Sequence, residues 1–117
     1  MTLNRGDVAL VRFPHTAGGR GKKRPVVVVQ ADAYNARLNH VVVAEVTTNL
    51  AERADPAYLF IDLSTPDGLA TGLVQDSLVC CVLLAAVNID RVAPIGQLSA
   101  ALLQQLDTCL KAALALP

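Results

Sequence analysis

The sequence Arg24-Pro25-Val26-Val27-Val28-Val29 decides the fold of this chain. Four consecutive valines after a proline are too short a run for a helix and are typical of a buried β-strand. A second valine-rich strand is predicted at residues 41–47, followed by the polar residues Thr48 and Asn49. Upstream, residues 8–13 predict another strand, so the first third of the chain reads as β-structure.

The rest of the sequence continues the β pattern and ends in a helix. Residues 31–38 predict a short helical turn, residues 58–63 a strand, residues 64–72 a turn-rich segment and residues 76–87 one or two strands. Ser99 is a suitable N-cap residue. Apolar residues then recur at helical spacing, at Leu102, Leu103, Leu106, Cys109, Leu110, Ala113 and Leu114. We therefore expect a mainly β (α+β) fold, a small barrel-like sheet of mostly antiparallel strands with peripheral helices and a C-terminal amphipathic helix.

Composition limits the class of protein. A chain of 117 residues with 53% hydrophobic residues predicts one folded domain over residues 1–117. The absence of a signal peptide and of any long apolar run predicts a cytoplasmic protein that does not enter membranes. Three cysteines without a C-x-x-C spacing, and two isolated histidines, argue against a disulfide framework or a metal site. We therefore expect no metal and no cofactor.

The formal net charge is zero, but the basic residues are unevenly spread. Four of the ten lie within five positions, at Arg20, Lys22, Lys23 and Arg24. Such a cluster is compatible with a solvated loop that only keeps the chain soluble. Glycines 18, 19 and 21 interleave with it, and a glycine backbone can approach an anion closely. The cluster therefore also predicts a phosphate-binding loop.

These motifs, taken in order, resemble the MazF/PemK family of toxin endoribonucleases. The matching features are Gly6-Asp7-Val8, Phe13-Pro14, Lys23-Arg24-Pro25 with the valine strand, Asn35, Thr47-Thr48-Asn49, Asp76-Ser77-Leu78-Val79, Ile89-Asp90, Ile95-Gly96-Gln97-Leu98-Ser99 and the terminal helix. Each motif is weak alone, whereas their shared order and spacing are specific.

The resemblance implies an SH3-like barrel that forms a homodimer and cleaves single-stranded RNA, such as mRNA, at short sequence motifs without a metal. The expected products carry 2′,3′-cyclic phosphate and 5′-hydroxyl ends. The resemblance also implies a cognate antitoxin whose acidic, disordered tail covers the RNA groove. In the family, an arginine before the proline and the first threonine at the end of the next strand are the catalytic pair. These positions are Arg24 and Thr47 here.

The chemistry of the pair fits this assignment. The guanidinium of Arg24 offers a planar fork of donors to the charged phosphorane, and it stays protonated at neutral pH, which argues against its acting as a base. Thr47 can donate its hydroxyl to a phosphate oxygen. His15 is the leading candidate for a general base because histidine titrates near neutrality, with Glu45 and Asp76 as weaker candidates.

A wider set of residues is predicted to bind RNA. Basic side chains bind backbone phosphates, and polar side chains at strand ends can read the exposed edges of single-stranded bases. The predicted RNA-binding residues are His15, Arg20, Lys22, Lys23, Thr48, Asn49, Asp76 and Ser77.

Two alternatives stay open. The plasmid-borne branch of the family places an arginine and an aspartate around a later cysteine, where this chain has Cys80 and Val82, and a histidine where it has Gly19. The acid–base scheme of that branch therefore cannot be carried over. One alternative is a protein-binding toxin on the same fold, like the CcdB topoisomerase poisons. The other is an RNA-binding module without catalytic activity.

Overall fold

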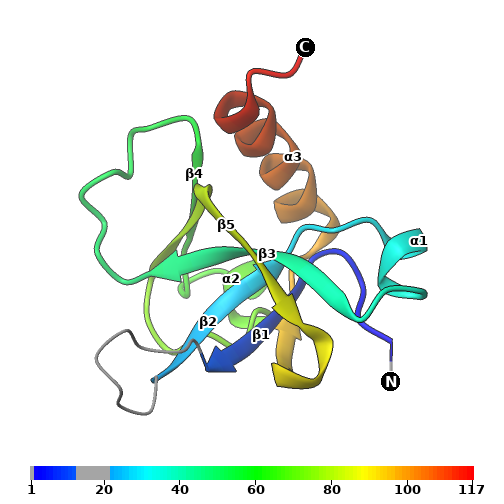
Figure 1. The fold of residues 1–117 in the computed structure, drawn as a ribbon. Helices are drawn as coiled ribbons and strands as arrows, with labels where there is room; N and C mark the ends of the chain where they lie inside the picture. Colours follow the sequence, from blue (N-terminus) through cyan, green and yellow to red (C-terminus); the bar gives the residue numbers. More distant parts are fainter. Residues whose placement is uncertain (1, 13–21) are drawn as a thin grey trace.

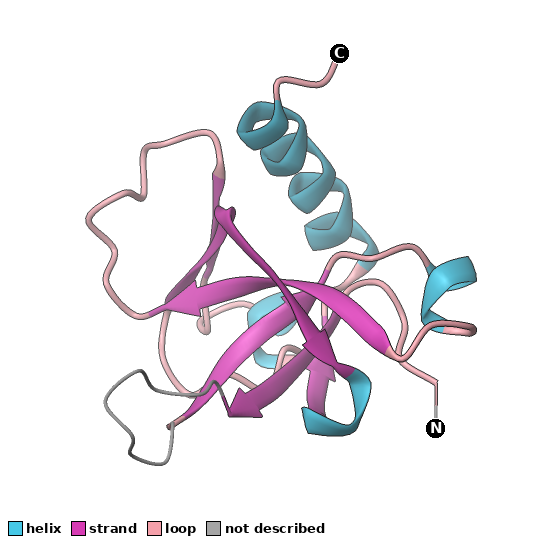
Figure 2. Cartoon of the chain, viewed as in Figure 1, coloured by secondary structure: helices cyan, strands magenta, loops and turns pink. Residues whose placement is uncertain are grey.

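The computed structural model describes residues 2–12 and 22–117, and these form a six-stranded sheet in the order β4-β5-β3-β2-β1-β6 (Figure 1). Every neighbouring pair in this order is antiparallel. The strands are β1 (Asp7–Arg12), β2 (Lys23–Val28), β3 (His40–Thr47), β4 (Tyr58–Ile61), β5 (Ser77–Asn88) and β6 (Val92–Gln97). The helices are α1 (Asp32–Asn35), α2 (Pro66–Leu69) and α3 (Ala100–Leu114), with a 3-10 turn at Ile89–Arg91 (Figure 2).

The two valine strands form next to each other, as the sequence predicts. β2 and β3 are paired through Val26–Glu45, Val27–Ala44 and Val28–Val43. The valine side chains of β2 point alternately to the two faces of the sheet, because successive side chains of a strand point to opposite faces. Val27 joins the core on the α3 side, whereas Val26 and Val28 join a second core on the other face. This is why all three valines of the strand are fully buried.

The long apolar segment at residues 77–88 is a single strand with a sharp irregularity. Ala44 of β3 pairs with Leu84 of β5, but the next residue, Glu45, pairs with Cys80. Residues 81–83 of β5 therefore have no partner on β3, and Val82 and Leu83 are 51% and 48% exposed. The first part of β5 pairs with β4 and the end of β3, and the second part pairs with the start of β3.

The expectation of a barrel is only partly correct, because the sheet is not closed. β4 and β6 stand at its two ends and do not pair with each other. A segment after α2 covers the outer edge of β6: Gln97 N donates to Ala70 O at 3.2 Å. The contact is so close that a Cβ at Gly96 would lie 2.4 Å from the backbone of Thr71. The segment after α2 thus lies against the last two residues of β6.

The sequence patterns do not predict two of the observed elements, β6 and α2. β6 contains Pro94 and Gly96 and is largely exposed, so it lacks the alternating apolar pattern of a buried strand. The segment expected to be only turns holds the short helix α2, whose first turn is capped by Thr65 Oγ1 accepting from Gly68 N at 3.0 Å. Both elements are stabilised by local or edge contacts that hydrophobic periodicity does not reveal.

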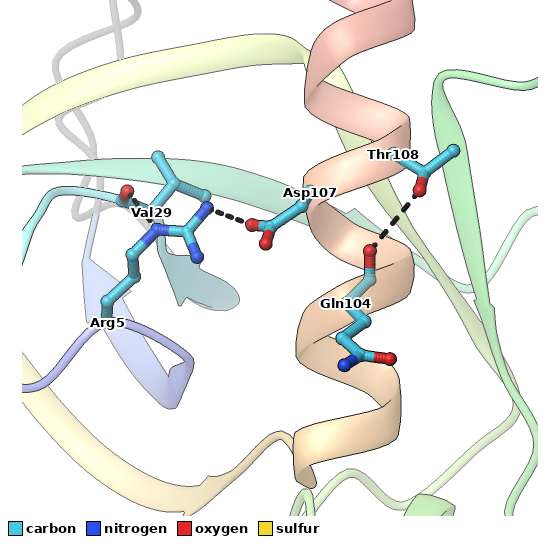
Figure 3. Close-up of polar contacts among 5 residues, drawn as sticks. All are labelled: Arg5, Val29, Gln104, Asp107 and Thr108. Carbon is cyan, nitrogen blue, oxygen red and sulfur yellow. Dashed lines mark hydrogen bonds and ion pairs between the residues drawn. The ribbon is translucent and has the colours of Figure 1, made fainter.

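The C-terminal helix was predicted correctly, including its start. Ser99 Oγ accepts a hydrogen bond from Leu102 N at 3.2 Å. Farther along, Asp107 forms an ion pair of 2.7 Å with Arg5, whose Nε donates to Val29 O at 3.0 Å (Figure 3). The N-terminal segment, the end of β2 and α3 therefore meet at one arginine. No described helix is both long enough and apolar enough to cross a membrane.

The contact of α3 with the sheet predicts a large loss of stability when its central leucine is truncated. Leu106 is fully buried, so Leu106→Ala should lower the free energy of unfolding by about 2–5 kcal/mol. Leu114, on the same helix, is 51% exposed, and Leu114→Ala should change it by no more than about 0.5 kcal/mol. Urea denaturation of both variants measures the difference. Equal effects would contradict the packing described for α3.

Candidate active site

The start of β2 and the end of β3 bring the two predicted catalytic residues to one side of the sheet. Arg24 lies in β2 opposite Val11 of β1, and Thr47 ends β3 opposite Leu78 of β5. The β2–β3 register, continued for two residues, brings Arg24 level with Thr47. Both positions are on the face that carries Val26 and Val43. In Figure 1, β2 starts at the lower left and β3 ends at the left.

Pro25 explains why the regular pairing of β2 with β3 stops before Arg24 and Thr47. Pro25 has no N–H to donate, so regular β2–β3 pairing ends at Val26. The Arg24 side chain is exposed and forms no hydrogen bond or ion pair with any described residue. Its donor fork is therefore available to an anion.

The hydroxyl of Thr47 is oriented by the turn that follows β3. Thr47 Oγ1 accepts a hydrogen bond from Asn49 N at 3.1 Å, and Asn49 Oδ1 accepts from Ala51 N at 3.0 Å. Because these oxygens are used as acceptors, the Thr47 O–H and the Asn49 amide N–H groups remain as donors. The turn after β3 thus presents these donors toward solvent. Thr48, between Thr47 and Asn49 in the sequence, is exposed.

The basic run does not form a single patch, because strand alternation divides it. Arg24 shares a face with Thr47, whereas Lys23 lies on the other face, paired with Arg12 of β1. Arg12, Lys23, Asp90 and Arg91 contribute to a surface groove of about 360 Å³. Lys22 is exposed just before the strand. Arg12 and Arg91 were not singled out in the sequence, because only the β1–β2 and β1–β6 pairings bring them to Lys23.

Asp76 and Ser77 have structural partners. Asp76 Oδ1 accepts from Leu63 N at 2.8 Å, which holds the segment after β4 against the start of β5. Ser77 is 2% exposed and its hydroxyl donates to Gln75 O at 2.8 Å. A buried hydroxyl that is already bonded is poorly suited to contact a ligand. Asp76 remains exposed on its other side. The remaining predicted residues, His15 and Arg20, lie outside the described residues.

A row of titratable side chains runs across three strands beside Thr47. Glu45 of β3 is paired with Cys80 of β5, which is paired with Tyr58 of β4. Burial, with a further contribution from Glu45, raises the pKa of the Cys80 thiol. Burial, followed by the nearby Cys80 and Glu52, raises the pKa of the Tyr58 phenol. Both groups therefore keep their protons at neutral pH.

An arginine–aromatic contact lies on the neighbouring strand. The Arg53 guanidinium carbon is 4.0 Å from the centre of the Phe60 ring, and Phe60 is paired with Leu78. A hollow of about 380 Å³ lies between β4 and α3, lined in part by Arg53, Tyr58 and Gln105. Sequence reasoning missed Arg53 because it lies in a polar loop distant from the other basic residues. In the described part of the chain, no three His, Cys, Asp or Glu side chains are grouped to hold a metal ion.

Solved structures define the fold class first. A mycobacterial endoribonuclease in complex with its cognate antitoxin superposes with a TM-score of 0.75 at 22% identity, covering 98% of this chain and 97% of that one. A MazE–MazF structure from Deinococcus radiodurans has a TM-score of 0.78 at 18% identity and covers 100% of both chains. The fold is that of MazF toxins.

Sequence comparisons then establish the family. The family described as PemK-like, MazF-like toxin of type II toxin-antitoxin system matches residues 4–114. Endoribonuclease MazF6 of Mycobacterium tuberculosis and Endoribonuclease MazF2 of Mycobacterium bovis are each 32% identical over 114 residues, covering 95% of this chain and 96% of the relative. The chain belongs to the PemK/MazF toxin family, and the family assignment made from the sequence motifs is confirmed.

The buried thiols beside the site should be chemically inert in the folded protein. Cys80, Cys81 and Cys109 are all buried, and burial raises the pKa of Cys81 to about 12. Because the thiolate is the reactive form, iodoacetamide at pH 8 should modify the native protein at least about 100-fold more slowly than the denatured protein. Mass spectrometry of time points measures both rates. Rapid labelling of the native protein would show that β5 and α3 separate readily.

Proposed function

We propose that this chain is a sequence-specific, metal-independent endoribonuclease toxin in which Arg24 and Thr47 form the catalytic pair. The observation that supports the proposal is the β2–β3 register, which ends at Val26–Glu45 and leaves both Arg24 and Thr47 two residues beyond this pair, on the same face of the sheet. Family membership and the endoribonuclease relatives support the same activity. The substrate is single-stranded RNA such as mRNA.

The reaction needs no cofactor in this proposal. The ribose 2′-oxygen attacks the adjacent phosphorus and loses its proton, and the bond from phosphorus to the 5′-oxygen breaks. The products are a 2′,3′-cyclic phosphate and a 5′-hydroxyl that has gained a proton. Arg24 stabilises the charge on the phosphorane, and Thr47 donates a hydrogen bond to one of its oxygens.

The remaining polar groups arrange the RNA around this pair. Thr48 and Asn49 lie beside Thr47 and present donors to base edges. Lys22 precedes Arg24, and Lys23 borders the groove that contains Arg12 and Arg91, which suits the backbone phosphates of neighbouring nucleotides. His15, Arg20 and the exposed side of Asp76 complete the proposed RNA-binding set. For Ser77, which is buried and bonded to Gln75 O, the proposed role is to hold the start of β5 in place rather than to contact RNA directly.

An antitoxin and a second copy of the chain are the proposed partners. Structural neighbours include toxins in complex with an antitoxin. An acidic, disordered antitoxin tail would be attracted to the exposed Lys22, Lys23 and Arg24 and would exclude RNA from them. The exposed apolar residues Val82 and Leu83, on the bend of β5, are suited to contact with a second copy in a homodimer. The proposed place of action is the cytoplasm, where mRNA is available.

Truncating the catalytic pair should abolish cleavage without unfolding the protein. Arg24→Ala and Thr47→Val each remove a preorganised donor and should each slow single-turnover cleavage by at least about 100–1,000-fold. Arg37→Ala and Thr108→Val, at exposed sites away from the strand ends, serve as matched controls. The assay uses a long transcript in EDTA with mapping of the product ends. Wild-type rates in the folded Arg24 or Thr47 variant would exclude that residue from catalysis.

Neutralising the lysines before β2 should weaken RNA binding in a salt-dependent way. The double variant Lys22→Ala/Lys23→Ala loses up to two phosphate contacts, so the slope of log K against log salt should decrease by about 1–2. Lys111→Ala, near the end of α3, should leave the slope unchanged. Fluorescence anisotropy with labelled single-stranded RNA measures the slope. An unchanged slope in the double variant would place the RNA elsewhere.

A further inference from the structure

One carboxylate beside the proposed catalytic pair has no structural use. Glu45 is half-buried on β3, yet it forms no hydrogen bond or ion pair with any described residue. Carboxylates that are removed from water are normally paired, because desolvation disfavours the charged form. A half-buried and unpaired glutamate in the middle of a sheet therefore calls for a functional explanation.

The sheet register places this carboxylate next to the reacting groups. Glu45 and Thr47 are two residues apart on the same strand, so their side chains point to the same face, about 7 Å apart along it. Arg24 precedes Val26, the partner of Glu45, by two residues on β2, so its side chain points to the same face as the Glu45 carboxylate. No ion pair joins these opposite charges. A cation, a hydroxyl and a carboxylate thus share this region of the face of the sheet.

The other titratable groups near this position are unsuited to accept a proton. Cys80 is paired with Glu45, and Tyr58 is paired with Cys80; burial raises the pKa of both, so they are already protonated at neutral pH. On the β2 side, Val26 faces Glu45 directly, and the guanidinium of Arg24 offers donors and no acceptor. Among these described groups, the carboxylate of Glu45 is the available base.

We propose that Glu45 is the general base of the RNA cleavage reaction. This inference rests on the proposed ribonuclease function. The Glu45 carboxylate takes the proton from the 2′-hydroxyl as the 2′-oxygen forms its bond to phosphorus. The bond from phosphorus to the 5′-oxygen then breaks, and the leaving oxygen gains a proton from solvent or from the carboxylic acid just formed. Thr47 and Arg24 hold the phosphate during this transfer, and no oxidant or metal is required.

The test is the pH dependence of single-turnover cleavage by Glu45→Gln, which keeps the shape of the side chain but cannot accept the proton. A general base contributes about 10²–10⁴-fold, so the rate of the variant should fall by at least about 100-fold. The wild-type rate should decline toward acid pH as the carboxylate is protonated, and this decline should disappear in the variant. Glu52→Gln, at the chain's other glutamate and on an exposed loop, is the matched control and should keep the wild-type profile.

Measuring RNA binding by Glu45→Gln distinguishes a chemical role of Glu45 from a structural one. An RNA with a 2′-deoxy sugar at the cleavage position cannot react, and Glu45→Gln should bind it at least as tightly as the wild type does. Thermal unfolding should show that the variant is folded. Glu45→Asp should keep the acid decline at a reduced rate.

The possible failures are distinguishable. Cleavage by Glu45→Gln within about threefold of wild type, with the same pH profile, would overturn the role of Glu45 and leave the ribonuclease function intact. Persistence of the acid decline in Glu45→Gln and its loss in His15→Gln would assign the base to His15 instead. Absence of cleavage by the wild type under all conditions would overturn the proposed function itself, and this assignment with it.

Discussion

The pairing register of β2 and β3 is the constraint on which the rest of the structure depends. A strand of consecutive valines cannot set its own register, because a shift by one residue replaces each valine by another. Such a shift would move Arg24 to the opposite face from Thr47. The neighbours of the run must therefore hold it. Val29 N donates to Val42 O at 3.0 Å at one end, and Pro25 ends the ladder at the other. On the β1 side, Gly6 N donates to Val28 O at 2.8 Å, and Gly6 adopts a φ of +95°, which glycine reaches without strain.

Sequence patterns predicted the elements whose side chains determine their environment. The valine strands and the amphipathic α3 follow from periodicity and from the Ser99 cap, and the Arg24–Thr47 pair follows from the family motifs. The open sheet did not follow, because whether β4 and β6 pair with each other is not encoded in the apolar pattern of either strand. The sequence patterns also did not reveal that the basic side chains of β2 lie on opposite faces of the sheet. Lys23 and Arg24 are adjacent in sequence, and only strand alternation separates their side chains.

The site is built at the ends of strands whose middles form the core. Val26 and Val43 are fully buried, whereas Arg24 and Thr47 lie two and four residues farther along and reach solvent. The same strands would therefore hold the proposed catalytic groups in place without placing charges in the core. Glu45, the proposed base, lies between these zones, level with Val26.

The cover on β6 has a consequence for how copies of this chain can assemble. An open sheet has two edges, and any strand with free backbone groups can accept a strand from another molecule. Here Gln97 N donates to Ala70 O, which covers the last residue of β6, and Pro94 in the middle of the strand has no N–H to offer a neighbour. The outer side of β4 pairs with no described strand, and β4 contains no proline. β4 is therefore the edge better suited to accept a strand from another molecule.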